Sequence, residues 1–111
     1  MTHDQTIKRI EAKLKGILRW ARIRCETRRR PKPQVTVPWL LKAWKRQRGI
    51  CPIFHLKMTL DGPLGPTLDQ IEPGKLYTRK NTQIVAKAAN AFKGTMTMKE
   101  TRSLLRKVRA A

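Results

Sequence analysis

One stretch in the second half of the chain most constrains the fold, because it alternates short apolar runs with strong turn signals. Residues 67–71 and 82–85 have the length and composition of β-strands. Residues 72–80 between them carry a Pro-Gly turn signal. Residues 86–92 have helical composition, and Gly94 follows as a helix terminator. The sequence therefore predicts two strands joined by a loop and followed directly by a helix, in a chain of the α+β class.

A long amphipathic helix is predicted at the start of the chain. Apolar residues recur every three or four positions between Ile7 and Cys25, and basic residues occupy the opposite face. Thr2 or Asp4 can cap the start of this helix, and Pro31-Lys32-Pro33 stops it. The basic face is equally compatible with DNA contact and with simple exposure to solvent.

A second helix is predicted after a short basic linker. Thr36 can cap it, Pro38 lies in its first turn, and Gly49 ends it. Its apolar stripe contains Trp39 and Trp44, which we expect in the core rather than in contact with bases, because a small domain must bury that face.

The remaining segments carry weaker signals. Residues 50–60 are apolar and partly β-branched, which favours a strand or a hairpin arm, and residues 61–66 hold two turn signals. Residues 97–100 form a capping box that opens a C-terminal helix. We expect three apolar side chains of that helix to face inward: Leu104, Leu105 and Val108.

The charge of the chain indicates a polyanionic partner. Its 26 lysines and arginines face only 7 acidic residues among 111, which gives a net charge of +19. No fold needs such an excess, since self-repulsion opposes compaction, and nucleic acid is the commonest partner of such chains. We expect phosphate contacts from Lys93 on the predicted helix after the hairpin and from the basic residues of the first two helices and the segments that follow them, which are Arg22, Arg24, Arg28, Arg29, Arg30, Lys32, Lys42, Lys45, Arg46 and Arg48.

Cysteine usage and hydropathy predict a cytoplasmic protein. Cys25 and Cys51 are too few for a disulfide framework, and the N-terminal residues lack the apolar segment of a signal peptide. No apolar run approaches the ~20 residues that cross a bilayer, so we expect no membrane partner.

Polar residues stand in a distinctive order around the predicted hairpin. Asp69 lies at the end of the first strand, and residues 81–85 read Asn-x-Gln followed by two hydrophobic residues. Asn90 and Lys93 follow on the predicted helix. This order resembles the core of the HNH endonucleases, and the loop residues 73–77 are similar to those of phage members of that family. The resemblance covers about half of the chain.

The resemblance implies a ββα-metal fold that hydrolyses phosphodiester bonds in DNA with one bound Mg²⁺ or Mn²⁺. It makes Asp69 and Asn90 the metal ligands and Asn81 the scaffold of the loop. The position of the general base holds Gln70, whose amide cannot accept a proton near neutral pH. His55 is the one central imidazole that could serve as an alternative base.

Many HNH domains also hold a structural zinc between two Cys-x-x-Cys pairs. The four corresponding positions here are Cys51, Phe54, Ala86 and Ala89, so three of the four ligands are missing. Because tetrahedral zinc needs four ligands, we predict no structural zinc. Packing of Phe54 over the two alanines is the expected substitute.

The sequence thus predicts an α+β chain in two parts. Residues 1–35 form a basic helix and arm, and residues 36–111 form an HNH-like ββα-metal domain with a C-terminal helix. The expected function is that of a bacterial or phage endonuclease, weakened or silenced at Gln70, which acts on DNA and on no small-molecule substrate as a monomer or homodimer. The alternatives are a non-catalytic DNA-binding or regulatory protein on the same fold, or a ribosomal-type RNA-binding protein.

Overall fold

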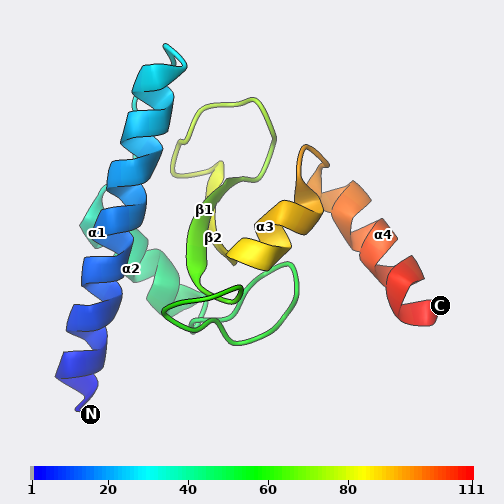
Figure 1. Cartoon of the computed structure of the whole chain (residues 1–111), viewed down its shortest axis with the longest axis horizontal. Helices are drawn as coiled ribbons and strands as arrows, with labels where there is room; N and C mark the ends of the chain where they lie inside the picture. The colour runs from blue at the N-terminus through cyan, green and yellow to red at the C-terminus, as the bar shows by residue number, and fades with distance from the viewer. Residues whose placement is uncertain (1) are drawn as a thin grey trace.

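The computed structural model describes residues 2–111, and this part of the chain forms four α-helices and one antiparallel sheet of two strands. The elements in order are α1 (His3–Thr27), α2 (Val37–Arg46), β1 (Pro66–Gln70), β2 (Thr82–Ala86), α3 (Lys87–Lys93) and α4 (Met98–Ala110). Helix α1 and helix α4 lie at opposite ends of the molecule, with the sheet between α1 and α3 (Figure 1). The predicted α+β class is confirmed.

The first two helices begin and end where their local signals predict. Thr2 caps α1 in a capping box with Gln5, and the chain leaves the helix shortly before Pro31. The Thr36 hydroxyl oxygen accepts a hydrogen bond from the Trp39 amide at 3.3 Å at the start of α2.

Gly16 lies in the middle of α1 without a packing reason. No atom lies within 4 Å of the position that a Cβ would take there. Because glycine is less favourable than alanine by about 0.8–1.0 kcal/mol in a helix interior, Gly16→Ala should raise the free energy of unfolding by roughly 1 kcal/mol. Urea denaturation followed by circular dichroism measures this, and a destabilised variant would contradict it.

The predicted hairpin and the helix after it are present, each within one residue of the expected bounds. Strands β1 and β2 pair with Leu68 opposite Ile84 and Asp69 opposite Gln83. Strand β2 runs directly into α3, which ends at Gly94 with a φ of +52°, a conformation that favours glycine. The two strands and α3 are therefore consecutive in the chain and adjacent in space.

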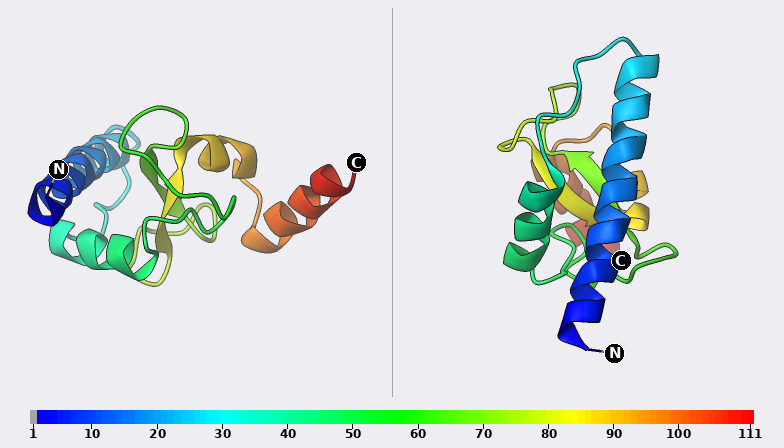
Figure 2. Two further views of the ribbon diagram at one scale, coloured as in Figure 1. Left: turned by 90° about the horizontal axis from the view of Figure 1, so that it is seen from below. Right: turned by 90° about the vertical axis from the view of Figure 1, so that its left-hand side faces the viewer.

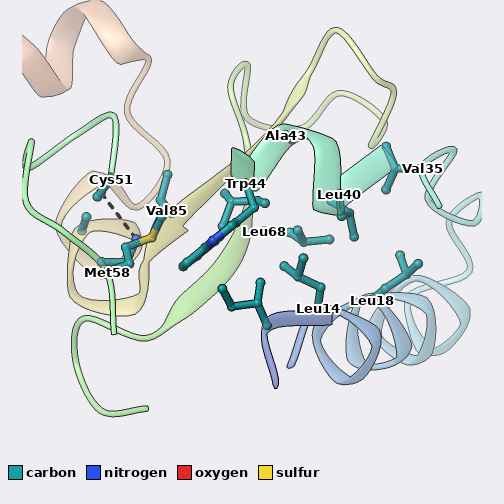
Figure 3. Packing of buried hydrophobic residues seen from close by; sticks show 14 of the residues in the cluster. Leu14, Leu18, Val35, Leu40, Ala43, Trp44, Cys51, Met58, Leu68 and Val85 are labelled. Carbon is teal, nitrogen blue, oxygen red and sulfur yellow. Dashed lines mark hydrogen bonds between the residues drawn. The ribbon is translucent and has the colours of Figure 1, made fainter. Parts of the chain in front are cut away.

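A single hydrophobic core joins the helices to the sheet (Figure 3). Leu14 and Leu18 of α1 meet Leu40 of α2 and Leu68 of β1 in this core. The predicted boundary after residue 35 therefore does not separate two cores. Trp44 is buried as expected, whereas Trp39 is half-buried and lies under the Arg46 guanidinium, whose central carbon is 5.7 Å from the ring centroid.

The predicted strand over residues 50–60 is wrong. This segment is a loop whose only ladder contact, within the described part of the chain, is an isolated bridge between Ile50 and Lys57. The Cys51 carbonyl accepts a hydrogen bond from the His55 amide at 2.8 Å, and His55 has a φ of +58°. This tight turn closes the segment on itself, so its apolar residues enter the core from a loop rather than from a strand.

The predicted inward face of α4 is wrong at two of its three residues, while the third, Leu105, is half-buried. Thr97 and Glu100 form the expected capping box, but Leu104 and Val108 remain 40% and 55% exposed. Among the helices and strands of residues 2–111, α4 packs against α3, and Met98 at its start also contacts Gln83 of β2, while the rest of the helix extends away from α1 and α2 (Figure 2). The start of α4 is predicted correctly because a capping box depends only on neighbouring residues, whereas burial of its apolar face requires another helix or strand to pack against it.

An ion pair fastens α1 to the turn before β1. The Lys13 ammonium lies 2.7 Å from an oxygen of Asp61. This hydrogen bond, with the charge of Lys13, holds the pKa of the Asp61 carboxyl below its ordinary value of 3.8. The contribution of this ion pair to stability is therefore present above pH ~4 and is lost as the pH falls through the lowered pKa.

Across residues 2–111, the helices all fall short of the length and apolarity that a membrane span requires.

Candidate functional site

A cavity of about 320 Å³ lies where the C-terminal end of α1 meets β1 and α3. Residues far apart in the sequence meet there because β1 packs against both helices. The residues that define its chemistry are Arg24, Arg28, Asp69, Gln70, Asn90 and Lys93. The structure thus brings together the acid, the glutamine and the helical asparagine that the sequence singles out. We call this space the Asp69 cavity.

The acid of this cavity is already paired with a lysine. Asp69 is 4% exposed and Lys93 is 1% exposed. The Lys93 ammonium lies 3.1 Å from Oδ1 of Asp69 and also donates a hydrogen bond to the Gln70 carbonyl oxygen at 2.9 Å. A buried ion pair is stable only when its polar atoms are satisfied in this way.

The second oxygen of Asp69 accepts a hydrogen bond from Gln83. The Gln83 side-chain amide donates to Oδ2 at 2.9 Å across the hairpin, where the two residues are direct partners. The same amide lies 3.4 Å from the Met98 sulfur, which connects the site to the start of α4. The glutamine of the Asn-x-Gln pattern therefore orients the carboxylate.

Asn81 fastens the loop between the strands. Its Oδ1 accepts a hydrogen bond from the Glu72 amide at 2.7 Å. Its Nδ2 donates to the carbonyl oxygens of Glu72 at 3.3 Å and Leu76 at 3.0 Å. These contacts close the loop at its base, so Asn81 is part of the scaffold and not of the cavity wall.

Neither candidate for the general base is placed for proton transfer. Gln70 lines the Asp69 cavity, half-buried, and its side-chain oxygen lies 3.4 Å from the Gly74 amide. His55 is exposed on the turn beside α4, where Arg102 and Arg106 are its neighbours in a separate hollow. The role of His55 as an alternative base is therefore wrong, since the structure does not bring its imidazole to the cavity.

The residues present fit a resident divalent cation poorly. Asp69 is the one carboxylate that lines the cavity, and both of its oxygens already accept hydrogen bonds. Asn90 is half-buried, and its side-chain carboxamide makes no hydrogen bond to residues 2–111. No cluster of three or more His, Cys, Asp or Glu side chains forms within these residues. A cation beside Oδ1 would also face the Lys93 ammonium in a poorly solvated site, which is electrostatically unfavourable.

Two of the expected phosphate-binding residues line the Asp69 cavity. Arg24 lies in the last turn of α1 and Arg28 follows at its C-cap, and both are exposed. Neither guanidinium forms an ion pair with the described residues. The other exposed candidates lie on α1, on α2 or in the segments that follow these helices, and are Arg22, Arg29, Arg30, Lys32, Lys42, Lys45, Arg46 and Arg48.

Lys93 requires a correction, because sequence reasoning places it among the surface contacts to nucleic acid. Its side chain is buried, and its ammonium is shared between Asp69 and the Gln70 carbonyl. Its position at the end of α3 turns it back toward β1 rather than outward. Lys93 therefore neutralises the cavity's carboxylate and is not free to meet a phosphate in the way an exposed lysine is.

The four positions that the resemblance compares with zinc ligands lie in an apolar region or beside it. Cys51, Ala86 and Ala89 are buried, and the Cys51 sulfur accepts a hydrogen bond from the Ala86 amide at 3.4 Å. Phe54 packs against the core, and its ring centroid lies 5.9 Å from that of Phe92. Apolar contacts therefore fill this region, with Phe92 as an additional partner that the sequence does not reveal.

Two residues near the site have contacts or exposure that the sequence does not predict. The Gln47 carboxamide accepts from the Ile84 amide at 3.2 Å and donates to the Ile84 carbonyl at 2.8 Å, so it pairs with the free edge of β2. Trp20 is 64% exposed on α1. The one sequence signal that could have indicated an open space beside Trp20 is Gly16, which lies four residues earlier and therefore on the same face of the helix.

The Asp69 cavity suits an anion that offers several oxygen acceptors. Arg24 and Arg28 present guanidinium N–H groups with fixed geometry, and the Asn90 amide adds another donor. Comparisons of this chain with models of protein families, with characterised proteins and with solved structures find no match.

Proposed function

We propose that this protein binds DNA through its phosphate backbone and does not hydrolyse it. The observation that carries this proposal is the charge state of the Asp69 cavity. Two arginines and one lysine line it with a single carboxylate, which leaves a formal charge of +2. Because the Asp69 carboxylate is already paired with Lys93, the exposed guanidinium groups of Arg24 and Arg28 are available to bind an external anion.

The rest of the chain supports a polyanionic partner of extended shape. Of the net charge of +19, the N-terminal residues 1–48 carry +12, from 15 basic and 3 acidic residues spread over both N-terminal helices and the linker between them. Phosphate contacts of this kind fix a protein on DNA without reading its sequence, and they weaken as salt increases. We therefore expect binding with little sequence preference and a strong dependence on ionic strength.

The order β1, β2, α3 is the order that the HNH resemblance implies. Asp69, Asn81 and Asn90 stand on the first strand, at the end of the loop and on the helix. We infer a ββα unit of this kind that retains its scaffold and its affinity for DNA. The lack of a basic group at Gln70 and the hydrogen bonds on both oxygens of Asp69 argue against metal-dependent hydrolysis.

Incubation with supercoiled plasmid tests this directly. In the presence of Mg²⁺ or Mn²⁺ we expect neither the wild-type protein nor Gln70→His to nick the plasmid, while both retard it in a gel. The added imidazole does not release Asp69 from Lys93, so a base alone is insufficient.

Three outcomes would contradict the proposal. Cleavage by the wild-type protein that disappears in Asp69→Asn would show an active nuclease. Cleavage by Gln70→His alone would show that a divalent cation displaces Lys93 and that only the base is missing. Absence of any retardation at low salt would remove DNA as the partner.

A further inference from the structure

A second hollow lies on the molecule beside the Asp69 cavity. It measures about 330 Å³ and is formed by the exposed side of α1, the start of β1 and the start of α3. Helix α1 lies alongside β1 there (Figure 1). The residues that matter are Gly16, Trp20, Arg24, Thr67 and Lys87. We call this hollow the Trp20 groove.

An aromatic side chain is left uncovered in the Trp20 groove. Trp20 is 64% exposed, although burying an indole is normally favourable. Gly16 lies one helical turn before it on the same face, and no atom lies within 4 Å of its missing Cβ. The glycine therefore keeps open the space beside the indole that any other residue would partly fill.

The charges around the indole favour an anionic occupant. Arg24 lies one turn after Trp20, and Lys87 faces α1 from the start of α3. Lys13 also lines the groove, but its ammonium is held by Asp61 at 2.7 Å. No acidic side chain is among the described residues that line this groove. An aromatic surface surrounded by cations is the arrangement that binds a nucleotide with its base stacked and its phosphate paired.

The Trp20 groove adjoins the Asp69 cavity, with Arg24 and Thr67 between them. Arg24 and Thr67 line both spaces, so a chain that leaves one enters the other at the Arg24 guanidinium. A base on Trp20 would therefore have its phosphate next to Arg24 and the following phosphate toward Arg28. In a duplex both faces of an internal base are covered by its neighbours, so such stacking requires an unpaired base.

We propose that the Trp20 groove takes an unpaired base of single-stranded DNA, stacked on the Trp20 indole with its phosphate bound by Arg24. This inference rests on the proposed function, because it assumes that the Asp69 cavity holds the DNA backbone. It names the form of DNA that the protein prefers, which is a strand with accessible bases.

Substitution of Trp20 tests the stacking. For a fluorescent (dT)₁₂ strand, Trp20→Ala should weaken binding about 5- to 100-fold, while Trp20→Phe should retain part of the affinity. A duplex of equal length should bind Trp20→Ala as well as it binds the wild-type protein. Ile23→Ala is the matched control, since Ile23 is another exposed apolar residue of α1 that does not line the groove.

Gly16→Leu closes the groove without removing the indole. It should weaken (dT)₁₂ binding while the thermal midpoint stays at or above that of the wild-type protein, since the position is open and helical. Equal losses for single strand and duplex in Trp20→Ala, or no loss in either variant, would overturn the stacking proposal. A marked loss of affinity for single-stranded and duplex DNA alike in Arg24→Gln/Arg28→Gln, beside an intact effect of Trp20→Ala, supports both claims, whereas no loss in this double variant removes the proposed function itself.

Discussion

Replacement of Lys93 by methionine should lower the free energy of unfolding by about 3–5 kcal/mol, the largest stability effect that we expect from a single change in this chain. Methionine has a similar length, so the packing of the α3 end changes little. The variant instead leaves the Asp69 carboxylate buried, with only the Gln83 amide as its partner. Denaturation with urea, followed by circular dichroism, measures the change. Since small domains are stable by only about 5–15 kcal/mol, a loss of this size is a large part of the total stability.

The double variant Asp69→Asn/Lys93→Met separates the charge from the packing. Replacing both members of a buried ion pair by neutral groups is often nearly neutral for stability, so the double variant should recover most of the loss. Lys99→Met, at an exposed lysine of α4, is the control and should change stability by less than about 0.5 kcal/mol. A cost for Lys93→Met as small as that of the control would show that the ion pair does not form in solution.

Local signals in the sequence are sufficient for most of the secondary structure. Thr2, Thr36 and Thr97 cap the helices at the expected residues, because a cap depends only on the three residues that follow it. The hairpin is also predictable, since its strands and loop are consecutive and Asn81 closes the loop with neighbours at most nine residues away.

Features that depend on distant partners are not predictable in this way. The apolar face of α4 has a helical pattern, yet in residues 2–111 no other element covers Leu104 and Val108. Lys93 is buried because α3 packs against β1, where the lysine pairs with Asp69, a residue 24 positions earlier in the sequence. A lysine at a helix end is usually exposed, so sequence reasoning assigns it to the surface with the other basic residues.

The candidate site shows the same division. Sequence reasoning identifies Asp69, Gln70 and Asn90 as members of one site, and the structure places all three on one cavity. It does not reveal that Arg24 and Arg28 complete this cavity, since they lie more than forty residues away on α1. His55 is expected as a possible alternative base because it is the one central imidazole of the sequence, whereas the chain forms a turn there that leaves it exposed and outside the cavity.

Charge reversal at the two arginines of the Asp69 cavity should have the largest effect on DNA binding. Arg24→Glu/Arg28→Glu removes two phosphate contacts and places two carboxylates beside the backbone. We expect the affinity for DNA to fall by about 100-fold or more at 0.1 M salt, and the slope of log K against log salt to become shallower by about 1.4 to 1.8. Fluorescence anisotropy with labelled DNA at several salt concentrations measures both quantities.

Lys42→Glu/Lys45→Glu provides the matched control, because it makes the same change in net charge on α2, whose residues do not line the cavity. Long-range repulsion from four lost units of charge is equal in the two variants and is largely screened beyond about 10 Å at 0.1 M salt. If the Asp69 cavity binds the DNA backbone, the arginine variant should therefore lose much more DNA affinity than the lysine variant. Equal losses would mean that the overall charge of +19 attracts DNA without a defined site, and a larger loss in the lysine variant would move the interface to α2.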